Sequence, residues 1–138
     1  MQKNTSANRT VLSHVNCGGR PKYKSQYIST TSSLDTALHY KNKGEKEGLS
    51  GLRIAEIDLN NLPKSCKIID LTSEENRDKY LGKAVCKNFA KASNEVLLQC
   101  DVAIPFKVID PSEPKGKLLQ SSGGLSGEHF LIASCRSF

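Results

Sequence analysis

A run of hydroxyl side chains is the first feature of this chain that suggests chemistry. Tyr27 and Ile28 lead into unbroken hydroxyl residues from Ser29 to Ser33, and the apolar spacing that starts at Leu34 predicts a helix. A strand that ends in hydroxyls and turns directly into a helix presents short donors and acceptors, which suits a sugar or a phosphate-bearing ligand. The simpler interpretation is a plain strand followed by a helix that Ser33 caps.

A single glutamate is the second feature. Glu95 stands at the junction between a helix or loop and a strongly apolar strand, within the segment Asn88–Phe106. A carboxylate at the first residue of a core strand is desolvated on one side and held rigidly, as a catalytic acid must be. An ordinary turn residue also fits this position. The glutamate is therefore informative only together with the hydroxyl run.

The apolar pattern predicts about six strands and two helices without a regular βαβ alternation. Strands are expected at Tyr27–Thr30, Leu52–Leu59, Cys66–Leu71, Glu95–Cys100, Val102–Ile109 and His129–Cys135. A short helix is expected from Leu34 to about residue 40, a longer one from Ser73 to Ala92, and a short strand or helical turn at Thr10–Val15. This order predicts an α+β domain with mainly antiparallel sheets.

Length and composition limit the function classes. A chain of 138 residues suits a single domain, with residues 1–10 expected to be flexible. No apolar run is long enough to span a membrane. The odd number of cysteines, without a CxxC pair, predicts free thiols in a reducing compartment rather than a zinc site, although a leader removed from a longer precursor leaves secretion open. Compartment and oligomeric state stay unassigned.

The net charge of +6 favours anionic partners such as nucleotides, nucleic acids or acidic surfaces. Lysines recur at every fourth position of the longer expected helix, at Lys79, Lys83, Lys87 and Lys91. Such a stripe is usually a solvated helix face. The alternative is a track of phosphate-binding side chains.

Taken together, the two features resemble a known family. Ser29-Thr30-Thr31 after an apolar strand, followed further on by Glu95-Val96-Leu97, resembles the mono-ADP-ribosyltransferases with an Arg/His–Ser-Thr-Ser–Glu signature. The nearest members are the pierisin-like and bacterial-toxin-like enzymes, in which an H-V pair, here His14-Val15, precedes the hydroxyl strand. The resemblance covers about residues 11–110. No motif of a dinucleotide-binding fold, P-loop, zinc protease or α/β-hydrolase is present.

The resemblance implies a split sandwich of two mainly antiparallel β-sheets, with a few flanking helices, that holds NAD+ as a substrate and needs no metal. Glu95 is then the catalytic residue that holds the ribose and stabilises an oxocarbenium-like state while nicotinamide leaves. Ser29 orients Glu95, and Thr30 and Thr31 shape the nicotinamide side. The family's gripping Arg or His corresponds to His14 or, if the first strand is missing or degenerate, to Arg9.

Phe89 and Ser93 fall in the family's acceptor-recognition segment. Arginine-modifying members carry Glu or Gln where this chain has Ser93, so the resemblance implies a nucleic-acid base or a non-arginine protein side chain as acceptor, or hydrolysis of NAD+. A second hypothesis is a degenerate, non-catalytic module of the same fold that binds nucleic acid, nucleotide or a protein. A third is an unrelated α+β domain.

Overall fold

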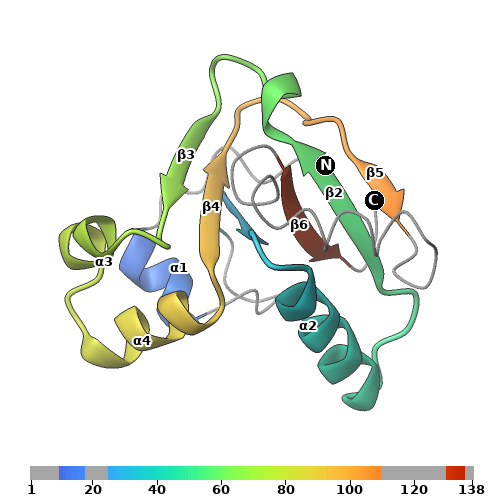
Figure 1. Cartoon of the computed structure of the whole chain (residues 1–138), viewed down its shortest axis with the longest axis horizontal. Helices are drawn as coiled ribbons and strands as arrows, with labels where there is room; N and C mark the ends of the chain where they lie inside the picture. The colour runs from blue at the N-terminus through green and yellow to red at the C-terminus, as the bar shows by residue number, and fades with distance from the viewer. Residues whose placement is uncertain (1–9, 18–24, 110–129, 136–138) are drawn as a thin grey trace. The chain divides into compact units, whose positions relative to one another are not determined.

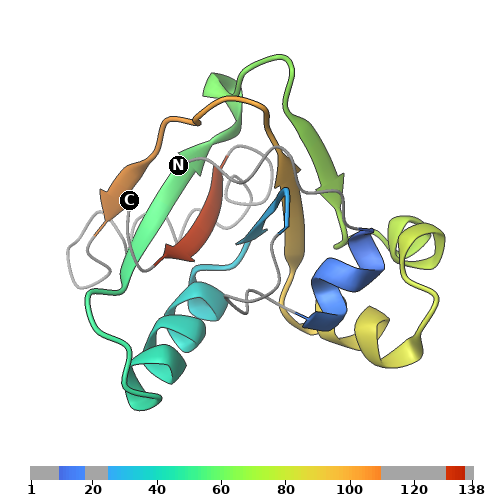
Figure 2. The ribbon, with the colours of Figure 1, turned by 180° about the vertical axis from the view of Figure 1, so that it is seen from behind.

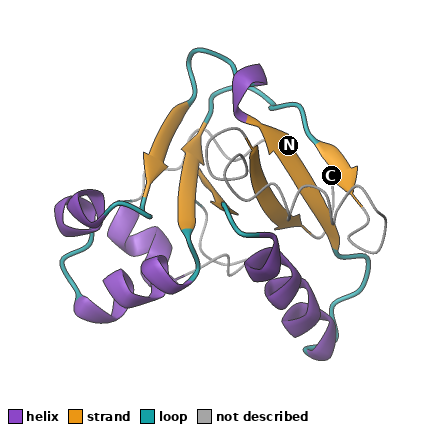
Figure 3. Ribbon diagram, in the orientation of Figure 1, coloured by secondary structure: helices purple, strands orange, loops and turns teal. Residues whose placement is uncertain are grey.

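The computed structural model describes residues 10–17, 25–109 and 130–135. Within them, helices and strands mix as an α+β protein (Figure 3). The chain divides into two compact units, and strand β1 (Tyr27–Thr31) contributes to both. Unit 1 contains Thr30–Leu62 together with the described residues from Pro105 onward, and unit 2 contains the described residues up to Ser29 together with Pro63–Ile104.

Unit 1 is a small antiparallel sheet with one helix. Its elements are the end of β1, α2 (Leu34–Lys46), β2 (Arg53–Asp58), the 3-10 turn η1 (Leu59–Asn61), β5 (Lys107–Ile109) and β6 (Phe130–Cys135). The strand order is β1-β6-β2-β5, in which β2 pairs antiparallel with both β5 and β6. The core forms where Leu34 and Ala37 of α2 pack on Ile54 of β2, and Figure 1 shows α2 beside β2.

Unit 2 gathers three helices beside strands β3 and β4. Its elements are α1 (Val11–Cys17), the start of β1, β3 (Lys67–Asp70), α3 (Glu74–Tyr80), α4 (Ala84–Ala92) and β4 (Glu95–Gln99). The strand order is β3-β4-β1, and β3 pairs antiparallel with β4. Figure 2, seen from behind, shows α1 next to α3 and α4. Helices, strands and loops all contribute side chains to the core of this unit, which consists of Val11, Tyr27, Leu71, Leu81, Cys86, Ala90 and Leu97.

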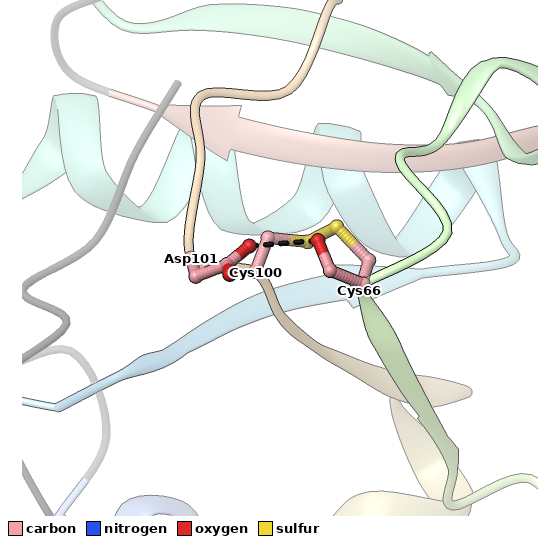
Figure 4. Close-up of a disulfide and its surroundings, with 4 residues drawn as sticks. Cys66, Cys100 and Asp101 are labelled. Atoms are coloured by element: carbon pink, nitrogen blue, oxygen red, sulfur yellow. Dashed lines mark hydrogen bonds between the residues drawn. A yellow bond between two sulfur atoms is a disulfide. The ribbon is translucent and has the colours of Figure 1, made fainter.

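A disulfide closes one end of the β3–β4 pair. Cys66 and Cys100 stand one position beyond the Lys67–Gln99 pair of the ladder and are bonded to each other. The next pair outward is also joined, because the Ser65 hydroxyl donates to the Asp101 carboxylate over 2.7 Å (Figure 4). The prediction of free thiols is therefore wrong for Cys66 and Cys100, because strand register brings together two cysteines that lie far apart in sequence. Among the described residues, Cys86 is a free, buried thiol.

The longer predicted helix is two helices. Leu81 has an extended backbone and a buried side chain, and Gly82 follows it, so α3 ends at Tyr80 and α4 starts at Ala84. The lysines from Lys79 to Lys91 therefore do not share one helix face. Lys79 lies over the Tyr80 ring, and Lys87 forms an ion pair with Asp78 over 3.1 Å.

Other element predictions hold with changed limits. Ser33 does cap α2, accepting a hydrogen bond from the Thr36 backbone N–H. That helix runs on to Lys46 through a buried glycine, Gly44, where a Cβ atom would lie 2.6 Å from Leu52 Cδ1. The strand predicted at Val102–Ile109 is regular only over Lys107–Ile109, since Pro105 has no backbone N–H for a ladder. In the described residues, no helix is both long and apolar enough to cross a membrane.

Candidate functional site

Helix α1 places His14 in the interior of unit 2. The helix starts after Thr10, whose hydroxyl accepts the Ser13 backbone N–H. His14 lies one helical turn after Val11, and both side chains are buried; His14 is only 2% exposed. An imidazole so far from solvent requires hydrogen-bond partners inside the protein.

Those partners lie at the start of β1 and just before it. Tyr27 and Ser29 share a face of β1 because strand side chains alternate with a period of two, and Ser25 precedes the strand, across a bend at Gln26. Ser25 Oγ lies 2.8 Å from His14 Nδ1, and Ser29 Oγ lies 2.7 Å from His14 Nε2. The Tyr27 ring stands edge-on to the imidazole at 5.6 Å between centroids. The side chains of Ser25, Tyr27 and Ser29 therefore hold the position of the histidine ring.

Glu95 is delivered by a tight turn between α4 and β4. Asn94 has a φ of 48°, a left-handed conformation that asparagine tolerates better than most residues. The turn ends α4 and starts β4 at Glu95, whose carbonyl accepts the Leu71 backbone N–H over 3.0 Å. The glutamate backbone is thus fixed on one side by the turn and on the other by the hydrogen bond to the segment after β3.

Burial controls the charge of the Glu95 side chain. Glu95 is 8% exposed, and desolvation raises the pKa of its carboxyl to about 7, while hydrogen bonds from Ser29 and Ser93 act to lower it. Ser93 has one hydroxyl hydrogen, for which the Phe89 carbonyl, at 2.8 Å, competes with the carboxylate. The carboxyl therefore changes protonation near neutral pH, in the range where general acids and bases operate.

The structure brings together His14, Ser29, Ser93 and Glu95 of the predicted site residues, all in unit 2. Thr30 and Thr31 follow on β1 in unit 1, both buried, and the Thr31 hydroxyl accepts the Ser33 backbone N–H. Phe89 is 46% exposed on α4, and Val85 one turn earlier is 70% exposed. Arg9 lies outside the described residues.

Ser25 is the site residue that the sequence reasoning missed. Its separation of eleven positions from His14 carries no recognisable pattern, because α1 and the segment before β1 approach each other only in the folded unit. Ser25 also precedes the strand, across a bend at Gln26, so the alternation of strand side chains does not place it on the face of Ser29.

The side chains of the site form a row from Ser25 through His14 and Ser29 to Glu95. Ser29 is the exposed member, while the other three are buried. The arrangement can present a hydroxyl and a carboxylate of controlled charge to a polar ligand. Among the described residues, no group of three or more His, Cys, Asp or Glu side chains has the arrangement of a metal site.

A family model described as a domain of unknown function, DUF7587, matches residues 2–103. The chain belongs to the DUF7587 family. No curated protein and no solved structure matches it. The matched region contains every member of the row and the whole of α1, α3, α4 and β4.

Proposed function

We propose that this DUF7587 protein transfers ADP-ribose from NAD+ to a non-arginine acceptor, a nucleic-acid base or a protein side chain, or hydrolyses NAD+ when water takes the acceptor's place. The observation that carries the proposal is Glu95, a buried carboxyl that titrates near neutral pH beside the exposed hydroxyl of Ser29. The resemblance of Ser29-Thr30-Thr31 and Glu95-Val96-Leu97 to the mono-ADP-ribosyltransferases gives that pair its chemical meaning.

In the proposed reaction the bond between the ribose C1′ and the nicotinamide nitrogen breaks, and its electron pair leaves with nicotinamide. Ionised Glu95 stabilises the positive charge that develops on the ribose and holds a ribose hydroxyl. The acceptor then forms the new bond to C1′ and loses one proton. Because a carboxylate in a desolvated position interacts strongly with a nearby cation, the burial of Glu95 supports this role.

The acceptor side of the proposal depends on α4. Ser93 stands near Glu95 in place of the acidic or amide residue of arginine-modifying enzymes, and its hydroxyl cannot form a paired contact with a guanidinium. Phe89 offers an exposed aromatic ring one turn before Ser93, which suits stacking on a base or an apolar side chain. Ser93 thus supports a non-arginine acceptor, and Phe89 supports one that can stack on an aromatic ring.

Nicotinamide release is the test. Purified protein with NAD+ should release nicotinamide, and Glu95→Gln should lower the rate at least about a hundredfold, since one electrostatic contact to a transition state commonly accounts for that factor. The rate should fall about tenfold for each pH unit below about 7, because only ionised Glu95 acts. Equal release by wild type and Glu95→Gln, or none from either, would refute the proposal.

A non-catalytic module that binds nucleic acid, nucleotide or a protein is the second candidate. The observation that favours it is the occupation of both His14 ring nitrogens by Ser25 and Ser29, which leaves neither nitrogen to grip the phosphates or ribose of NAD+. Calorimetric titration with NAD+ and with a single-stranded oligonucleotide distinguishes the two. Binding of the oligonucleotide without any release of nicotinamide favours the module.

A further inference from the structure

We infer that His14 and Ser25 are positioning residues for Glu95, which together turn the Ser29 hydroxyl toward the carboxylate. They do so by fixing the imidazole as the tautomer that carries its hydrogen on Nε2. The effect on turnover rests on the proposed function, but the tautomer and its influence on Glu95 do not.

The direction in which each hydrogen bond of the row points follows from counting the available hydrogens, beginning at Ser25. The Ser25 hydroxyl accepts the Tyr27 backbone N–H over 3.2 Å and lies 2.8 Å from His14 Nδ1. Ser25 is buried, so its own hydroxyl hydrogen needs an acceptor, and among the described residues Nδ1 supplies it. An unprotonated Nδ1 places the hydrogen of a neutral imidazole on Nε2.

The same count continues to the carboxylate. Nε2–H then donates to Ser29 Oγ over 2.7 Å, and the single hydroxyl hydrogen of Ser29 is left to donate to Glu95. A hydrogen bond to a charged acceptor is stronger than one between neutral groups, so the row favours the ionised carboxylate against the effect of burial. With the opposite tautomer, Nε2 would accept the Ser29 hydrogen and draw it away from Glu95.

The charged side chains on the elements around Glu95 either form hydrogen bonds with other groups or are exposed to solvent. Asp70 of β3 accepts hydrogen bonds from Thr72, and Arg77 of α3 donates to the carbonyls of Leu71 and Thr72. Lys91 of α4 is exposed. The hydrogen bonds of the row therefore favour the ionised form of Glu95 from the β1 side, against the effect of its burial. Ser93 does the same from the α4 side.

Ser25→Ala tests the inference, because the hydrogen bonds of the Ser25 side chain join it to His14 and to the Tyr27 backbone, so that it reaches Glu95 through His14. Nitrogen-15 NMR of the His14 ring, without NAD+, should find the hydrogen on Nε2 in the wild type. In Ser25→Ala the Nδ1–H form should appear. Carbon-13 NMR of the Glu95 carboxyl should then show a titration midpoint about one pH unit higher. Below that midpoint, the shift makes the ionised fraction of Glu95 about tenfold smaller. Ser25→Thr, which keeps the hydroxyl, should restore both readings.

Two results would overturn the inference: a wild-type His14 with its hydrogen on Nδ1, or a Glu95 midpoint that is the same in wild type and Ser25→Ala. The first needs no variant, so poor folding of Ser25→Ala cannot obscure the answer. In turnover assays the acidic limb of the pH–rate profile should move upward with the midpoint, whereas simple loss of folded protein would lower the rate at every pH. Correct NMR results without any nicotinamide release would refute the proposed function alone.

Discussion

Glu95 destabilises the fold when it is ionised. Its folded pKa of about 7 lies above the ordinary value of 4.5, so between these pH values the folded state binds a proton that the unfolded state does not. Stability is therefore lost as pH rises through this window, and the loss is complete above pH 7, where it reaches about 3 kcal/mol. Such a cost is typical of functional carboxylates and is hard to explain in a residue that serves only the fold.

Glu95→Gln should accordingly stabilise the protein at alkaline pH. The amide keeps the shape and an acceptor oxygen for Ser29 but carries no charge, so the free energy of unfolding should exceed that of the wild type by about 2 kcal/mol at pH 8. The difference should shrink toward pH 5, where wild-type Glu95 is already protonated. Urea denaturation at several pH values measures it. The control is Glu47→Gln at an exposed position, for which a change within about 0.5 kcal/mol is expected; a wild type as stable as Glu95→Gln at pH 8 contradicts the prediction.

At the residue level, the sequence named Glu95, Ser29 and His14 as candidates and placed Ser29 beside Glu95, but it did not predict the contact of His14 with Ser25 and Ser29. The hydroxyl run and the lone glutamate are local patterns, so they are visible in one dimension. The contact of His14 with Ser25 and Ser29 depends on how α1 packs in unit 2, which no local pattern encodes. The histidine expected to grip NAD+ is thus found bonded to two serines.

At the scale of elements, the α4–turn–β4 segment is what positions the site. The sequence correctly predicted the start of β4 at Glu95, because a continuous apolar run begins there. It did not predict the break between α3 and α4, since apolar positions keep a helical spacing across Leu81 and Gly82. Tertiary burial of Leu81 in an extended conformation overrides that local preference.

The Cys66–Cys100 disulfide should stabilise unit 2 by closing a loop across the β3–β4 pair. A link between residues separated by 34 positions in sequence removes enough unfolded-state entropy to contribute about 3–4 kcal/mol. Urea denaturation with and without a reducing agent should differ by about this amount. The double variant Cys66→Ser/Cys100→Ser should match the reduced protein and be insensitive to the reductant. Identical oxidised and reduced curves, with the bond confirmed by mass spectrometry, would contradict the prediction.

At the scale of the whole molecule, the fold class was predictable and the finer architecture was not. Strand-rich patterning without βαβ alternation correctly predicted an α+β protein with antiparallel pairing. The split sandwich of two sheets is the finer prediction, and the alternation of side chains along single strands does not specify it. It remains a prediction together with the proposed function.

The net positive charge of the chain bears on the choice of acceptor. With +6 overall and exposed Lys83 and Lys91 at the two ends of α4, a nucleic-acid acceptor should bind beside Phe89 through its phosphates. Transfer of ADP-ribose to a single-stranded oligonucleotide should then fall about tenfold or more for a tenfold rise in salt, because each neutralised phosphate releases counterions. Hydrolysis of NAD+ by water should change little. Rates of both reactions in one salt series measure this.

The variants Lys83→Gln/Lys91→Gln and Lys43→Gln/Lys46→Gln remove the same charge from α4 and from α2, where the lysines are also exposed. Only the α4 pair should flatten the salt dependence of transfer, since local contacts with phosphates, rather than the total charge, determine its slope. If both pairs act equally, the effect is one of overall charge, and α4 does not bind the acceptor. Transfer to a protein substrate that is insensitive to salt in every variant would assign the acceptor to a neutral protein surface that packs on Phe89 and Val85.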